Sequence, residues 1–105
     1  PGQQQLEYDF QVAPGADAGQ IRLSVSGSVG LALDNQGNLV VHTAAGDLIQ
    51  HAPVLSQQVD GNARPISGQF VLHGENQVGF RVGAYDPSKP LLIDPSYVYS
   101  TAVLP

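Results

Sequence analysis

The sequence has no cysteine, no methionine and no tryptophan, and it is poor in charge. The missing cysteine excludes disulfide bonds, thiolate metal ligands and Cys–His catalysis, and it leaves the redox compartment open. Only 12% of the 105 residues are charged, about half the usual share, and the net charge is −5. Because a phosphate backbone or an anionic membrane surface is bound by clustered cations, we expect neither nucleic acid nor membrane as a partner. The cations are Arg22, Arg64, Arg81 and Lys89.

Long hydrophobic runs are also missing. No apolar stretch approaches the roughly 18 residues that cross a bilayer, so we expect no membrane insertion. Within these residues no basic segment is followed by an apolar segment, so we expect no signal peptide among them. The opening letters "PGQQQ" are typical of a position inside a longer chain, and the many uncharged polar residues suit a secreted bacterial β-protein. We therefore expect residues 1–105 to form a single β-domain, excised from a larger extracellular protein.

Apolar and polar residues alternate with a period of two in several places, and helical periodicity is nearly absent. Hydrophobic residues make up 42% of the chain, enough for one core. Each alternating run predicts a half-buried strand. The predicted inward-facing residues are Leu6, Tyr8, Phe10 and Val12 in the first run, Ile21, Leu23 and Val25 in the second, and Val78, Phe80 and Val82 in the third.

Turn-forming residues separate these runs at intervals of about 8–12 residues. The chain has 12 glycines and 8 prolines, well above their average combined share of about 12%. Asp60-Gly61 is the strongest tight-turn pair. We predict eight to ten short strands, no helix, and an all-β fold built as an antiparallel two-layer β-sandwich, with a partly open barrel as the alternative. The predicted turns are residues 13–19, 26–30, 34–38, 44–47, 60–64, 73–76 and 86–90.

Two Asp-Pro pairs, Asp86-Pro87 and Asp94-Pro95, lie eight positions apart. Two carboxylates act as acid and base only when their surroundings separate their pKa values, and this spacing brings them together only across a hairpin. Aspartate and proline are also favoured turn residues, and proline denies a donor to a strand ladder. We favour this structural interpretation, with "LLI" as a short buried strand that begins after Pro90.

The loop of residues 34–38 resembles a calcium loop, with oxygen-bearing side chains at Asp34, Asn35 and Asn38 around a glycine. An EF-type loop also needs further acidic ligands and a bidentate Glu at its end, which is missing here. The simpler interpretation is a hairpin turn, although a calcium ion at this loop stays open.

His42, His51 and His73 fall on three separate predicted strands, without the close spacing of a metal-binding pair. We interpret them as ordinary strand positions. "VSGSVG" lacks the spacing of a nucleophile elbow, so no catalytic serine is indicated. We predict no catalytic residue, no metal ligand and no cofactor.

Tyrosines raise the possibility of carbohydrate binding, because sugars stack on exposed aromatic rings. Tyr8 and Tyr85 have core-like contexts, and Tyr97 and Tyr99 alternate on one face of a last strand, so core or corner positions are favoured. Lys89, the single lysine, could form a Lys–Asn or Lys–Asp crosslink only if it were buried beside an acidic side chain. Between Ser88 and Pro90 in a turn, it is expected to be solvated.

Three stretches resemble, in this order, a bacterial secreted domain of unassigned function: "LEYDFQVAPGADAGQIRLSVSG", "LALDNQGNLVVHTAAGDLIQHAPVLSQQVDG" and "VGFRVGAYDPSKPLLIDPSYVYST". The resemblance covers residues 5–101. Such domains sit N-terminal to SBBP-type β-propeller repeats in large cell-surface or extracellular proteins. The resemblance implies an extracellular or cell-surface location and carries no catalytic residue.

The chain departs from that family at both ends. Members carry a further stretch before "LEYDF", ending in a "YPGIDLVYYGN"-like strand, and only "PGQQQ" stands here. "YSTAVLP" replaces the usual "YSTYLGG" that opens the first propeller repeat. The link to a propeller therefore does not follow from this chain.

The leading hypothesis is a non-catalytic extracellular β-module that serves as a spacer or protein-interaction domain. One alternative is a carbohydrate-binding module, and another is a strand-exchanging subunit of a surface assembly. A third is weak hydrolysis by Asp86, Asp94 and a histidine, which requires these side chains to meet.

An unpaired strand edge invites pairing with another chain. We expect self-association through an edge strand, with "LEYDFQV" or "YVYSTAV" as donor, since both lie near a terminus and are rich in strand-forming residues. Glu7 and Asp9 in the first segment oppose such pairing, which favours the second segment.

Overall fold

The computed structural model describes residues 10–97, with side chains up to Asp94, and it contains nine β-strands and one short 3₁₀ helix. The predicted all-β class and the number of strands are confirmed, and no α-helix occurs between residues 10 and 97. The elements are β1 (Phe10–Val12), η1 (Ala18–Gln20), β2 (Leu23–Ser24), β3 (Ser28–Leu33), β4 (Leu39–Thr43), β5 (Gly46–Val59), β6 (Asn62–Ile66), β7 (Gly68–His73), β8 (Gln77–Val82) and β9 (Leu91–Tyr97).

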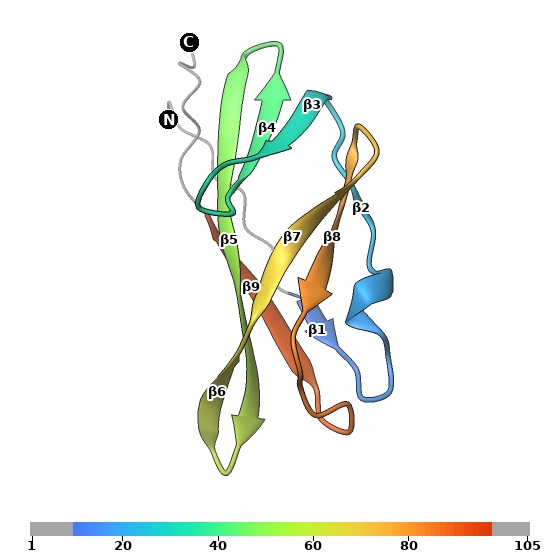
Figure 1. Cartoon of the computed structure of the whole chain (residues 1–105), viewed down its shortest axis with the longest axis vertical. Coiled ribbons are helices and arrows are strands. Elements are labelled where there is room, and N and C mark those ends of the chain that lie inside the picture. The colour runs from blue at the N-terminus through green and yellow to red at the C-terminus, as the bar shows by residue number, and fades with distance from the viewer. Residues whose placement is uncertain (1–9, 98–105) are drawn as a thin grey trace.

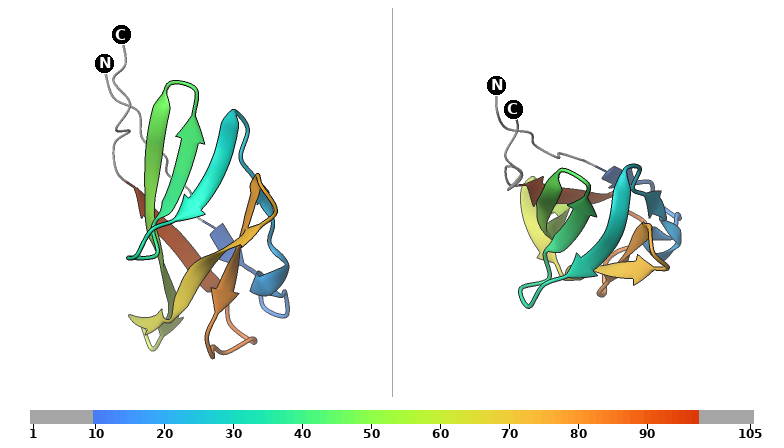
Figure 2. Two further views of the ribbon diagram at one scale, coloured as in Figure 1. Left: turned by 45° about the horizontal axis from the view of Figure 1, so that its top comes forward. Right: turned by 90° about the horizontal axis from the view of Figure 1, so that it is seen from above.

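The strands form two antiparallel sheets (Figure 1). The large sheet has the order β1-β9-β5-β4-β3, with β6 also paired to β5, and the small sheet has the order β2-β8-β7. Across the described strands the sheets do not close into a barrel, so the sandwich is confirmed over the barrel alternative. Figure 2 shows the two layers from two further directions, with β3 beside β4 at the margin of the large sheet.

The 14-residue strand β5 is the central strand of the large sheet. Its first part pairs with β4 and its last part with β6, while β9 pairs along the opposite edge. The β5–β9 register shifts between Gln50 and Pro53, and Pro53 lies opposite Pro95. Because neither proline has an N–H to donate, the regular backbone hydrogen bonding between β5 and β9 is interrupted at this residue pair.

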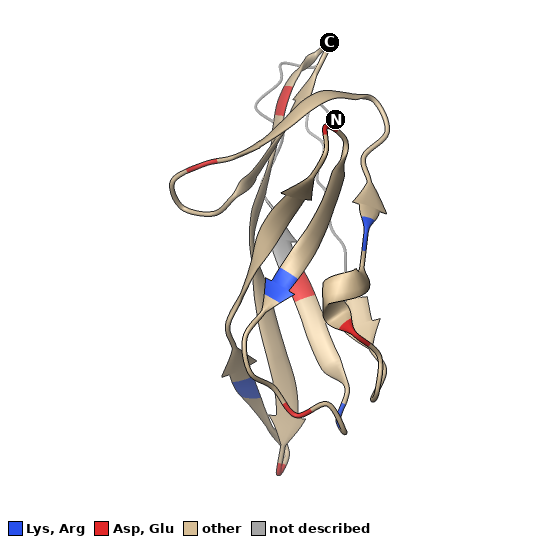
Figure 3. Ribbon diagram, turned by 45° about the vertical axis from the view of Figure 1, so that its right-hand side comes forward, with Lys and Arg blue, Asp and Glu red and all other residues tan. Residues whose placement is uncertain are grey.

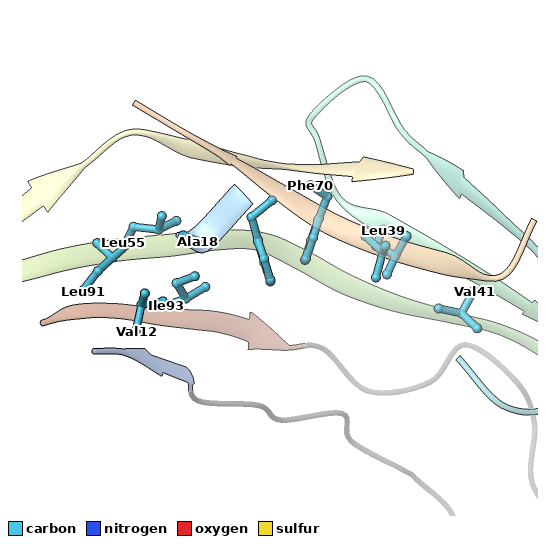
Figure 4. Close-up of a cluster of buried hydrophobic side chains, with 10 residues drawn as sticks. Val12, Ala18, Leu39, Val41, Leu55, Phe70, Leu91 and Ile93 are labelled. Atoms are coloured by element: carbon cyan, nitrogen blue, oxygen red, sulfur yellow. The ribbon is translucent and has the colours of Figure 1, made fainter. Parts of the chain in front are cut away.

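The core lies between the sheets (Figure 4). The ring centroids of Phe70 and Phe80 lie 5.7 Å apart, and those of Phe10 and Phe80 lie 6.2 Å apart in an edge-to-face arrangement. Aromatic pairs prefer such geometries over a face-to-face stack. The predicted faces are confirmed where the structure describes them, whereas Leu6 and Tyr8 lie outside the described residues. The buried hydrophobic residues are Val12, Ala18, Leu39, Val41, Leu55, Phe70, Val78, Phe80, Leu91 and Ile93.

The predicted turns at Asp60-Gly61 and at residues 34–38 are confirmed as hairpin connections. Asp60 and Gly61 have φ values of 53° and 82°, both positive as a type I′ hairpin turn requires. Of the predicted strand "IRLSV" (residues 21–25), only Leu23–Ser24 forms a strand, β2. The helix η1 ends at Gln20, directly before this segment.

Two details of the last strand differ from the predictions. Asp94-Pro95 is not a turn but lies inside β9, where Asp94 is opposite Val54. The "LLI" run is not buried throughout, because Leu91 and Ile93 point into the core while Leu92 is exposed. An antiparallel sheet can leave one face in water, so a continuous apolar run still alternates between core and solvent. Pro90 does directly precede the strand, as predicted.

Candidate functional site

The loop between β3 and β4 is held by the Asp34 carboxylate. Its Oδ1 accepts hydrogen bonds from the backbone N–H groups of Gln36 and Asn38, both at 2.9 Å. Its Oδ2 accepts from Asn38 Nδ2 at 3.0 Å, and the buried Asn38 uses its Oδ1 to accept from the Ala52 N–H at 2.9 Å. The loop is thereby fastened to β5 beside the β5–β9 register shift.

These donors determine the electrostatics of the loop. The Asn38 N–H is the largest cause that holds the pKa of Asp34 below its ordinary 3.8, and His51 adds a smaller Coulombic contribution. The ionised carboxylate therefore serves as a structural acceptor. Both Asp34 oxygens and the Asn38 oxygen, which a calcium ion would need, are engaged within the protein. Among the residues that the structure describes, no group of three His, Asp or Glu side chains could hold a metal ion.

Asp86 begins a similar turn between β8 and β9. Its Oδ1 accepts from Ser88 Oγ at 2.6 Å and from the Ser88 N–H at 2.9 Å. The Ser88 hydroxyl is the largest cause that lowers the pKa of Asp86 below 3.8, and the charge of Lys89 contributes least. The Asp86 carbonyl accepts from the Lys89 N–H at 3.2 Å. Asp86 is thus a structural turn residue, as predicted.

A buried glutamine that the sequence interpretation missed anchors this turn. Gln57 on β5 is only 3% exposed. Its Nε2 donates to the Asp86 carbonyl at 2.7 Å and lies 3.3 and 3.4 Å from the carbonyls of Lys89 and Pro90, while its Oε1 accepts from the Asp86 N–H at 3.0 Å. The alternation along β5 indicates this position, since Gln57 lies two residues after the buried Leu55.

The residues of the hypothetical hydrolytic group lie on several different elements. Asp86 lies in the β8–β9 turn and Asp94 in the middle of β9. The histidines lie on β4, β5 and β7, as predicted, and His42 Nδ1 contacts Asp47 Oδ1 at 2.8 Å across the β4–β5 pair. Asp86, Asp94 and the histidines thus lie on different elements, and the Asp86 carboxylate is used within its own turn.

The tyrosine and lysine predictions have mixed outcomes. Tyr85 is half-buried against the core, with its hydroxyl 3.5 Å from the Ala16 carbonyl, which agrees with a corner position. The side chains of Tyr8, Tyr97 and Tyr99 lie outside the described part of the structure. Lys89 lies in the predicted turn, but it is half-buried rather than fully solvated.

An apolar cavity of about 220 Å³ lies between the sheets. It is smaller than the roughly 300–1,000 Å³ of most small-molecule sites. Its wall includes core side chains from both sheets, and its polar residues are Arg22, Ser24 and Gln50. Arg22 is engaged with the carbonyls of Gly19 and Ile21 at 2.8 and 2.9 Å. The cavity therefore presents mainly hydrocarbon to any occupant.

A family model described as a domain of unknown function (DUF7948) matches residues 1–96. The chain belongs to this family. The match agrees with the expected domain of unassigned function, and the DUF7948 description states no activity, ligand or partner. No curated protein and no solved structure matches this DUF7948 chain significantly. In residues 10–97 there is no helix with the length and apolar character needed to cross a bilayer.

Proposed function

We propose that this DUF7948 domain is a non-catalytic β-module that acts as a spacer or protein-interaction domain in a bacterial cell-surface or secreted protein. The observation behind the proposal is that the candidate polar side chains make hydrogen bonds within the protein itself. Asp34 and Asp86 hold their own turns, Gln57 holds the second turn to β5, and His42 contacts Asp47. Groups used in this way stabilise loops and leave little freedom for chemistry on a substrate.

The surface supports an extracellular spacer role. Charged residues are few, and Figure 3 shows them scattered along the ribbon. Over the described residues, such a scattered arrangement gives no concentrated field that would attract a charged ligand. The low charge also suits contacts made through backbone hydrogen bonds and apolar side chains.

A hydrolase panel tests the absence of catalysis. The purified chain is expected to show no turnover beyond that of an Asp86→Ala, Asp94→Ala or His42→Ala variant. Turnover that any one of these substitutions abolishes would contradict the proposal. Protease added to intact cells of the source bacterium is expected to degrade the domain, and full protection in intact but not in lysed cells would contradict the surface location.

Carbohydrate binding is a separate alternative. The half-buried Tyr85 offers no open stacking platform, so this alternative depends on Tyr8, Tyr97 and Tyr99. A glycan array would decide it, with binding expected to disappear in a Tyr97→Ala, Tyr99→Ala variant if the alternative holds.

A further inference from the structure

The two ends of the hydrophobic core are packed differently. At one end lie Leu55, Leu91 and Ile93, which are at most 2% exposed (Figure 4). At the other end lie Leu39 and Phe70, and here the two sheets surround the apolar cavity of about 220 Å³. Protein interiors are close-packed, and voids larger than a water molecule are few. A space of this size within the core is therefore a candidate site for a ligand.

Side chains from both sheets form the wall of this cavity. β4 of the large sheet contributes Leu39 and Val41, and β8 of the small sheet contributes Val78 and Phe80. All four are at most 5% exposed. An engineered cavity of about 150 Å³ with a lining of Leu, Ile and Phe stays dry and binds benzene. The present cavity is larger and has the same kind of lining.

The polar residues of the wall indicate the charge of a suitable ligand. Arg22 is the single charged residue among the described lining residues, and its Nη1 donates to the carbonyls of Gly19 and Ile21. Ser24 is exposed, and the buried Gln50 carries no charge. Because burial of a charge is costly, a wall of this kind disfavours an ionised ligand. The cavity therefore selects an uncharged molecule.

The short strand β2 provides a route of entry. Leu23, Ser24 and Val25 form one continuous part of the wall. β2 pairs with β8 at two positions, and the Val25 N–H donates to the Asn76 carbonyl at 3.0 Å. A segment held by few backbone hydrogen bonds opens locally at a low cost in free energy. Opening of β2 would admit a small molecule while the large sheet stays folded.

We propose that the cavity is a binding site for an uncharged apolar molecule of about the size of one benzene ring. The volume admits such a molecule, and burial of its apolar surface supplies the affinity. Phe10, Phe70 and Phe80 all line the cavity, and their rings favour an aromatic ligand through edge-to-face or offset contacts. The site gives the β-module a ligand in addition to its proposed spacer or interaction role, and it does not depend on that role.

Benzene is a direct probe of the site. Isothermal titration calorimetry of the wild-type chain is expected to give a dissociation constant of about 1 mM or below, and benzene is expected to raise the melting temperature. Benzoate, the same ring with a carboxylate, is expected to bind more weakly by about tenfold or more, because its charge would have to be buried. No binding of benzene, or equal binding of benzoate, would overturn the proposal.

Substitutions in the wall connect binding to this cavity. Val41→Phe places a ring in the space and is expected to abolish benzene binding. The matched control is Val54→Phe, which adds the same ring at a 59% exposed position on β5 and is expected to bind benzene like the wild type. Leu39→Ala enlarges the cavity and is expected to admit naphthalene, which the wild type excludes. This gain of binding cannot result from a loss of folding, and its absence, or unchanged benzene binding in Val41→Phe, would overturn the proposal.

Side chains from the chain's own terminus are the alternative occupant. The expected donor segments "LEYDFQV" and "YVYSTAV" lie outside the described residues except for Phe10–Val12 and Tyr97, and self-association through them stays a prediction. If benzene binds a Leu6→Ala, Tyr8→Ala double variant but not the wild type, the chain itself fills the cavity and the proposal is overturned. The non-catalytic β-module would still stand, since catalytic turnover and cellular location test it separately.

Discussion

Replacement of Gln57 by glutamate changes one buried amide nitrogen into an oxygen at almost constant volume. In the wild type, Nε2 faces the carbonyl oxygens of Asp86, Lys89 and Pro90 at 2.7–3.4 Å. The introduced carboxylate would place negative charge against these three acceptors in a site that is 3% exposed. Burial and the missing donor both disfavour the ionised form, so the folded-state pKa of the new carboxyl is expected to rise.

The magnitude follows from linkage. A rise of about 2–3 pKa units above the unfolded value of about 4.3 corresponds to roughly 3–4 kcal/mol lost at pH 7. The sign is that of a raised pKa: the part of the penalty that comes from ionisation is absent below the unfolded pKa and grows as the pH rises toward the folded-state pKa. Near pH 3 the neutral acid can still donate one hydrogen bond, which leaves a penalty of about 1 kcal/mol.

Urea unfolding of the wild type, Gln57→Glu and Gln58→Glu between pH 3 and pH 7 measures this effect. Gln58 is the matched control, since it is the exposed neighbour on the same strand. The difference in unfolding free energy between wild type and Gln57→Glu is expected to widen with pH, while Gln58→Glu stays within about 0.5 kcal/mol of the wild type. A penalty that is small at pH 7, or that does not change with pH, would refute the role of Gln57 as the anchor of the β8–β9 turn.

Three further predictions concern stability. Gly79→Ala places a Cβ 2.7 Å from the Ile21 carbonyl oxygen, so its free energy of unfolding in urea is expected to fall by about 1–3 kcal/mol. The control Gly30→Ala, with its nearest contact at 3.7 Å, is expected to change the free energy of unfolding little. Equal effects of the two substitutions would contradict the packing at Gly79. Asp34→Ala is expected to make the free energy of unfolding less sensitive to acid. The lowered pKa of Asp34 gives stability that is present above pH 3.8 and is lost as the pH falls below it. An acid titration of unfolding that is the same for the variant and the wild type would count against this. Gly61→Ala is expected to lower the free energy of unfolding by about 1 kcal/mol because of its positive φ, and a calorimetric melting temperature equal to the wild type would exclude this strain.

The strands, their inward faces and the tight turns could be predicted from sequence because each depends on neighbours along the chain. The alternation of Val78 and Phe80 with Arg81 reports which face of one strand avoids water, whatever strand lies beside it. Asp60-Gly61 likewise forms its turn because these two residues tolerate positive φ. The same local logic correctly assigned residues 34–38 to a hairpin.

The order of strands and the use of single polar groups were decided only by the tertiary structure. Asp94-Pro95 has the composition of a turn, yet pairing of β9 with β5 places it within a strand, because a ladder with a neighbour outweighs the local preference of two residues. Gln57 becomes an anchor only because β5 lies against a turn 29 residues later in the chain. The sequence shows that β3 is uncharged, but only the sheet order leaves its second edge without a strand among the described residues. Such long-range neighbours depend on how both sheets bury their apolar faces together, which no local pattern encodes.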